Sequence, residues 1–117
     1  MRKIIGSLLL IVGLASALNA DTIKVFVASS AKLAMTEIAG EFKKSNPNDE
    51  IIMTFSATGK AYQQLTNGMD YDIFMAADSK HPEKIVADAM AISKPEIYAL
   101  GAVALYSNDK ELIKQGI

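Results

Sequence analysis

The sequence contains no cysteine and no tryptophan, one histidine and three prolines among 117 residues. Without cysteine there is no disulfide, thiolate nucleophile, cysteine-ligated metal or lipoprotein anchor. A single histidine does not allow a Ser-His-Asp set to be assembled with assurance. Neither sign of charge dominates, with 12 basic and 13 acidic residues, and basic residues form no run. Nucleic acid is therefore not expected as a partner.

The first twenty residues have the order of a secretory signal peptide. A short positive stretch (residues 1–3) precedes an apolar run (residues 4–14), and small residues follow up to Ala20. The apolar run is shorter than the roughly 20 residues that a membrane-spanning helix needs. We therefore expect residues 1–20 to be removed on export, with cleavage after Ala17 or Ala20, and the mature chain to be periplasmic.

Beyond residue 20 the chain alternates β-branched, apolar segments with amphipathic ones. Strands are predicted at residues 23–28, 51–55, 72–77 and 97–106, helices at 32–44, 60–66 and 82–90, and the beginning of a helix or loop at 109–115. The apolar face of the first helix is expected to comprise Leu33, Ala34, Ile38, Ala39 and Phe42. The segment 72–77 is nearly all apolar, as is typical of a strand buried on both faces. This alternation predicts an α/β fold, a parallel-sheet lobe flanked by helices.

Three predicted strand ends carry small or hydroxyl residues, namely Ser29-Ser30, Ala57-Thr58-Gly59 and Ala76-Ala77-Asp78. In parallel sheets ligands bind at the carboxyl ends of strands, close to helix N-termini. The free backbone N–H groups there can hold a small oxyanion, and a hydroxyl adds another donor. Two roles stay open for Ser30 and Thr58, because each could cap its helix, bind an anion, or do both.

Other chemistry-bearing residues do not assemble into a site. The segment 56–60 lacks the first glycine of a phosphate loop, and His81 is expected in a solvent-exposed loop. Asp70 and Asp72 flank one end of a predicted strand and Asp78 the other, roughly 20 Å away, so they cannot share an ion. No metal, cofactor or catalytic residue is therefore expected, although an exported hydrolase using Asp72 or Asp78 stays a weaker alternative.

Three segments stand in order along the chain, namely Val25-Phe26-Val27-Ala28-Ser29-Ser30, Phe55-Ser56-Ala57-Thr58-Gly59-Lys60 and Asp72-Ile73-Phe74-Met75-Ala76-Ala77-Asp78. Together they resemble the periplasmic molybdate-binding proteins of ABC transporters. The resemblance runs from about Ile23 to Tyr106. It implies a two-lobed, type II periplasmic-binding fold that closes on molybdate or tungstate, needs no cofactor, and serves a membrane permease as a monomer.

The resemblance also implies roles for particular residues. Ser30 would donate its hydroxyl and backbone N–H to the oxyanion, Thr58 would do likewise, and Ala77 would donate a backbone N–H. Thr58 stands where the family commonly has serine, and Ala57 lacks a hydroxyl often present there.

Family members are longer than this chain, so we expect a truncated chain or fragment. Residues 21–96 are predicted to form an incomplete first lobe, and residues 97–117 a crossover strand and the start of a second lobe. The alternatives are the same fold binding sulfate or phosphate, and a non-functional remnant.

Overall fold

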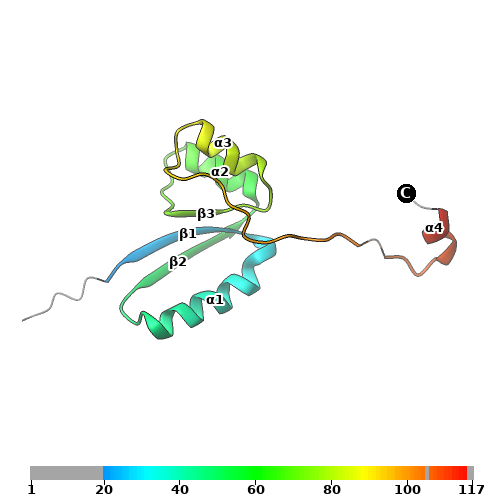
Figure 1. Cartoon of the computed structure of the whole chain (residues 1–117), viewed down its shortest axis with the longest axis horizontal. Helices are drawn as coiled ribbons and strands as arrows, with labels where there is room; N and C mark the ends of the chain where they lie inside the picture. The colour runs from blue at the N-terminus through cyan, green and yellow to red at the C-terminus, as the bar shows by residue number, and fades with distance from the viewer. Residues whose placement is uncertain (1–19, 105, 116–117) are drawn as a thin grey trace, which may run out of the picture.

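The computed structural model describes residues 20–104 and 106–115, so the predicted signal peptide lies, apart from Ala20, outside the described residues. The elements are β1 (Thr22–Ala28), η1 (Ser29–Ala31), α1 (Lys32–Ser45), β2 (Glu50–Ser56), α2 (Thr58–Thr66), β3 (Ile73–Met75), α3 (Lys80–Ala87) and α4 (Lys110–Gln115). Helix α1 covers one face of the sheet, and α2 and α3 cover the other (Figure 1). None of the described helices has the length and apolar character needed to cross a membrane.

The sheet has three parallel strands in the order β2-β1-β3. In the central strand, Phe26 pairs with Thr54 on one side and with Phe74 on the other. The last four residues of β1 are buried, because this strand has a neighbour on each side and helices on both faces. The predicted α/β class with a parallel sheet and flanking helices is confirmed.

The largest buried side chain lies beneath α2 and α3. Phe26 is fully buried and clusters with Ala28 and with Ala61 of α2. Its ring lies 4.5 Å from that of Phe74 and 6.0 Å from that of Tyr71, between centroids. These contacts fix β3 against β1 and so set the position of the segment that follows β3.

The predicted apolar face of α1 is wrong for three of its members. Leu33 is 82% exposed, Ile38 is 57% exposed, and Ala34 is exposed as well. The partly buried side chains are instead Met35, Ala39 and Phe42, which follow one another at helical spacing. Both the exposed and the partly buried sets of apolar residues recur at helical spacing. Periodicity alone therefore could not show which set faces the sheet.

Strand β3 is shorter and less buried than predicted. It covers three residues, and Ile73 is 48% exposed, because β3 has a strand on one side only among the described residues. The predicted strand at residues 97–106 is not formed in its described part, 97–104 and 106. No described strand pairs with it, so its backbone lacks the ladder that defines a strand. Its assignment as a crossover to a second lobe stays a prediction. A helix does form within the predicted range 109–115.

Candidate functional site

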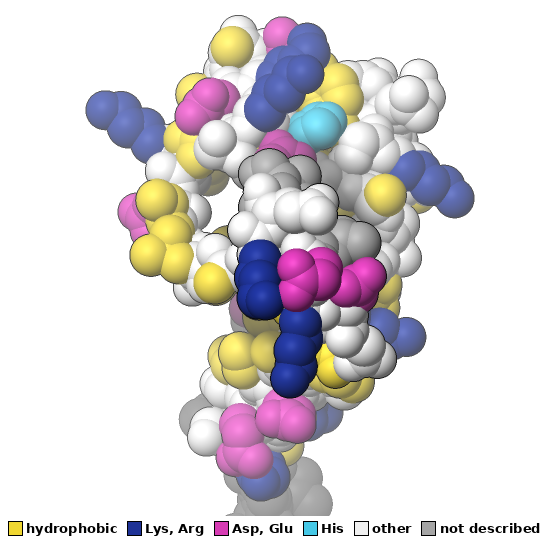
Figure 2. Space-filling model, turned by 90° about the vertical axis from the view of Figure 1, so that its right-hand side faces the viewer, with side chains coloured by type: hydrophobic (Ala, Val, Ile, Leu, Met, Phe, Trp, Pro, Cys, Tyr) yellow, Lys and Arg dark blue, Asp and Glu magenta, His cyan; other side chains and the backbone are white. Residues whose placement is uncertain are grey.

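The three predicted strand ends meet at one edge of the sheet. They line an open cavity of about 410 Å³, whose residues are Ala28, Ser29, Ser30, Ser56, Ala57, Thr58, Gly59, Ala77 and Asp78. The structure thus brings together Ser30, Thr58 and Ala77, which come from three separate parts of the chain. Figure 2 views the molecule from the side at which the strands end, with the C-terminal segment in front, and the one charged residue in the described lining of the cavity is Asp78. Local donors, and not a field of one sign, must therefore hold any anion in this cavity.

Backbone N–H groups at the start of α2 are open toward a ligand. The N-cap residue is Ala57, no side chain caps the helix, and the first bond of the helix joins the Ala61 N–H to the Ala57 carbonyl. The N–H groups of residues 58–60 therefore have no partner within the helix. Helix α1 likewise has alanine, Ala31, at its N-cap and no side-chain cap.

The capping interpretation of Ser30 and Thr58 is wrong for these two helices. Alanine occupies both N-cap positions, so the serine and threonine hydroxyls lie one residue away from the place where a cap bond forms. Ser30 lies in the short turn η1, where it is exposed. Thr58 is only 7% exposed and is the buried polar residue of the described core.

The Thr58 hydroxyl is oriented by the third strand end. The Ala77 N–H donates a hydrogen bond of 3.0 Å to Thr58 Oγ1. The hydroxyl hydrogen takes no part in this bond and stays available for donation to another acceptor. The Ala77 N–H is engaged with Thr58 here, so its direct donation to a ligand stays a prediction.

Asp78, at the rim of the cavity, is tied to His81. Its carboxylate accepts the backbone N–H of His81 at 2.9 Å and lies 2.9 Å from His81 Nδ1. The His81 N–H is the main reason that the pKa of Asp78 is lowered from its usual value, and hydrogen bonding and charge from the imidazole contribute further. These hydrogen bonds stabilise the ionised carboxylate, so one negative charge remains at the rim of the cavity.

The predicted exposed loop at His81 is wrong. The residue lies in the first turn of α3, which begins at Lys80, and its side chain is only 25% exposed. The helix begins earlier than expected because Pro82 occupies its first turn, a position where proline needs no donor, and Asp78 accepts the His81 N–H. The imidazole packs on Tyr62, with ring centroids 5.6 Å apart.

Asp78→Asn is expected to lower the melting temperature of the chain at neutral pH and to have little effect in acid. Asparagine keeps an acceptor for the His81 N–H but removes the charge. The folded-state pKa of Asp78 lies below its ordinary value of 3.8, so the stabilisation is present above 3.8 and is lost as the pH falls through the folded pKa. Thermal unfolding of variant and wild type, at neutral pH and at a pH below the folded-state pKa of Asp78, measures this. An equal difference in melting temperature at the two pH values would contradict the expectation.

Asp70 and Asp72, the other two aspartates considered as metal ligands, have structural partners. Asp70 forms an ion pair of 2.9 Å with Lys24, and Asp72 accepts the Lys24 backbone N–H at 2.7 Å, which fastens β3 to β1. Within the described ranges, no group of three histidine, aspartate or glutamate side chains is placed to hold a metal ion.

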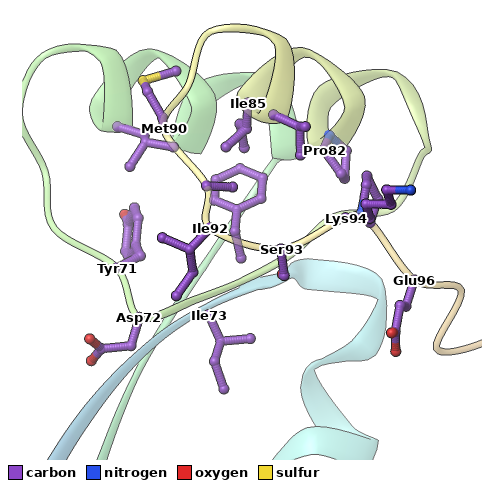
Figure 3. Close-up of a pocket in the computed structure, with 15 residues that line it drawn as sticks. Tyr71, Asp72, Ile73, Pro82, Ile85, Met90, Ile92, Ser93, Lys94 and Glu96 are labelled. Carbon is purple, nitrogen blue, oxygen red and sulfur yellow. The ribbon is translucent and has the colours of Figure 1, made fainter.

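A second cavity, of about 610 Å³, lies elsewhere, between β3, α3 and the segment after α3 (Figure 3). Much of its lining is apolar, including Tyr71, Ile85, Met90 and Ile92, while Lys94 and Glu96 lie together at one end. It is larger than the first cavity, but it contains none of the three predicted site residues and no cluster of hydroxyls. Size alone therefore does not identify the site.

A parallel α/β lobe whose strand ends bring backbone N–H groups and hydroxyls together can hold a small anion, as a solute-binding protein must. The chain belongs to the family of bacterial extracellular solute-binding proteins, whose family profile matches residues 23–114.

Within that class, the similar proteins share a ligand in their names. The chain is 34% identical over 95 residues to the molybdate-binding protein ModA of Azotobacter vinelandii, covering 80% of this chain and 37% of the relative. It is 29% identical over 104 residues to ModA of Rhodobacter capsulatus, covering 88% and 41%. The chain thus spans about two fifths of the length of these relatives.

A solved structure agrees in fold. It is the substrate binding domain ascribed to a molybdenum ABC transporter from Clostridium difficile, with a TM-score of 0.57 and 28% identity. The match covers 59% of this chain and 30% of that chain. The likeness confirms a fold of the periplasmic-binding type for the matched part of the chain.

Proposed function

We propose that this chain forms the first lobe of an exported solute-binding protein that binds molybdate and delivers it to the permease of an ABC transporter. The observation that carries the proposal is the convergence of Ser30, Thr58 and Ala77 on one cavity at the open start of α2. The names of the relatives support molybdate as the ligand. Tungstate is proposed as a second ligand, because it has the same tetrahedral geometry and charge.

Neutral donors can hold such an anion without lysine or arginine. Each hydrogen bond to a charged group contributes about 1.5–3 kcal/mol, so a few donors offset much of the dehydration of the ion. The residues that line the described cavity offer the N–H groups of Thr58 and Gly59, the Thr58 hydroxyl and the Ser30 hydroxyl. Partial positive charge at the start of a helix adds to these donors.

The same donors favour a fully ionised ligand. Molybdate and tungstate at neutral pH only accept hydrogen bonds, whereas hydrogenphosphate must also donate one. Thr58 Oγ1 already accepts the Ala77 N–H, so only one of its two lone pairs is left for a proton of the ligand. We therefore expect phosphate to bind least well, and sulfate, which is also fully ionised, to be separated from molybdate by size.

We also propose how the site continues beyond the described lobe. The donors come from one side of the cavity, which is open on the other. Residues 97–117 would lead to a second lobe that closes over the anion, as the two-lobed fold of the resembled family implies. Residues 1–20 would direct export to the periplasm, and the binding protein would work as a monomer.

The test is titration of the chain recovered from the bacterial periplasm with molybdate, tungstate, sulfate and phosphate. Calorimetry gives affinity, and amide shifts in NMR spectra locate the ligand. We expect molybdate to move the amides of Ser30, Thr58 and Ala77, with phosphate the weakest. The mass of the recovered chain shows whether its first 17 or 20 residues have been removed. No heat and no amide shift at millimolar molybdate would overturn the proposal for this chain. Stronger binding of sulfate would reassign the ligand.

A further inference from the structure

One peptide group next to the cavity is held at both of its polar atoms. The Ala76 carbonyl accepts a hydrogen bond of 2.8 Å from the Tyr98 hydroxyl, and the Ala77 N–H donates one of 3.0 Å to Thr58 Oγ1. The carbonyl and the N–H belong to the same amide. The two side chains that hold it come from residues 22 positions later and 19 positions earlier in the chain.

The two hydrogen bonds form a series through the Ala76–Ala77 amide, in which each group donates to the next. The Tyr98 hydroxyl donates to the amide, the amide donates to Thr58, and the Thr58 hydroxyl hydrogen is left for the next acceptor. Each bond in such a series polarises the next, by about 10–30% in condensed-phase estimates. A hydrogen bond to the Ala76 carbonyl therefore makes the Ala77 N–H a stronger donor, which in turn strengthens the Thr58 hydroxyl as a donor.

We propose that Tyr98 is a positioning residue of the anion site, acting through the Ala76–Ala77 peptide on the Thr58 hydroxyl. This role rests on the proposed function of the cavity. Tyr98 is not among the residues that line that cavity, so it acts at one remove from the ligand. It lies in the extended segment that leaves the lobe after α3 (Figure 1), which makes the donor strength of Thr58 depend on where that segment docks.

The series also bears on selectivity. While the Ala77 N–H occupies one of the two lone pairs of Thr58 Oγ1, donation by the hydroxyl is favoured over further acceptance, which suits an acceptor-only anion. If the Tyr98 hydroxyl is removed, the peptide is held at one end only and Thr58 is freer to accept a proton from a ligand. Loss of the hydroxyl should therefore weaken molybdate binding more than phosphate binding, whereas a general loosening of the fold would weaken both alike.

The test compares wild type with Tyr98→Phe in the full chain, by NMR titration with molybdate and with inorganic phosphate. We expect Tyr98→Phe to weaken molybdate binding by about two- to tenfold, the range for one neutral hydrogen bond. The Ala77 amide proton should move upfield before any ligand is added, and the ratio of molybdate to phosphate affinity should fall. The matched control is Tyr71→Phe, which removes a partly buried hydroxyl bonded to Gln64 Oε1 at 3.3 Å and should change none of these.

A second measurement keeps the role falsifiable if Tyr98→Phe loosens the fold. In a Thr58→Val background the last donor of the series is missing, because valine has no hydroxyl. Adding Tyr98→Phe to this variant should therefore cause no further loss of molybdate affinity. Equal losses in both backgrounds, or a Tyr98→Phe variant that behaves as Tyr71→Phe does, would overturn the positioning role. If wild type shows no molybdate-induced shifts, the proposed function falls and the positioning role falls with it. Wild-type binding with an unaffected Tyr98→Phe would remove the positioning role alone.

Discussion

Thr58→Val should weaken molybdate binding by about 10- to 100-fold, the equivalent of one hydrogen bond to a charged acceptor. Valine has nearly the shape of threonine, so the packing of a residue that is 7% exposed is largely kept. What is lost is the hydroxyl that accepts the Ala77 N–H and that we propose donates to the ligand. Calorimetric titration of the full chain with molybdate measures the difference.

The matched control for this change is Thr58→Ser. Serine keeps the hydroxyl and loses only a methyl, so affinity should stay within a few-fold of wild type. Selectivity between molybdate and sulfate can change in this variant, because the methyl adds bulk at the wall of the cavity. If Thr58→Val bound molybdate as tightly as wild type and Thr58→Ser, the hydroxyl would have no part in binding.

Phe26→Ala is expected to lower the free energy of unfolding by about 3–5 kcal/mol. The ring is fully buried in the central strand, and its removal leaves a cavity against Phe74, Tyr71 and Ala61. Such a loss is a large part of the total stability of a small domain, about 5–15 kcal/mol. Because Phe26 fixes β3, anion binding should weaken as well.

Urea denaturation of the full chain followed by circular dichroism gives this free energy. Leu33→Ala serves as control, because it removes an apolar side chain that is 82% exposed on α1. Its effect should be within about 0.5 kcal/mol of zero. Similar unfolding midpoints for Phe26→Ala and wild type would show that the ring does not anchor the sheet.

The chain order and the convergence of the strand ends could be predicted from sequence. A parallel α/β arrangement follows from local patterns, and local patterns also mark where each strand ends. Once strands are parallel, their carboxyl ends must meet at one edge, so Ser30, Thr58 and Ala77 come together without any knowledge of side-chain contacts. The family resemblance independently implied the same three residues.

The errors concern features that depend on neighbours. Residues 97–106 are apolar enough for a strand, but a strand also needs a partner, and none is present among the described residues. The exposure of Ile73 has the same origin at the open edge of β3. In α1, Leu33 and Met35 are equally apolar, and only the place where the helix rests on the sheet decides which is covered.

The polar contacts of the site could not be predicted from the sequence either. Thr58 and Ala77 lie 19 positions apart, and Tyr98 and Ala76 lie 22 apart, so no local spacing pairs them. No sequence pattern marks Tyr98 as a site residue, because a single tyrosine in an apolar segment is typical of ordinary core packing. Even the link between Asp78 and His81, three residues apart, depended on where α3 begins.

The strand order β2-β1-β3 has a thermodynamic consequence. The cavity exists only when all three strands are assembled, since each contributes one wall, and two of these walls are brought to the central strand by separate crossovers. An anion in it therefore binds the folded chain and has no counterpart in the unfolded one. At a ligand concentration of a hundred times the Kd, such linkage adds about 2.7 kcal/mol to the stability of the whole sheet. Occupancy of a site a few ångströms across is thereby converted into resistance to unfolding of every strand in the lobe.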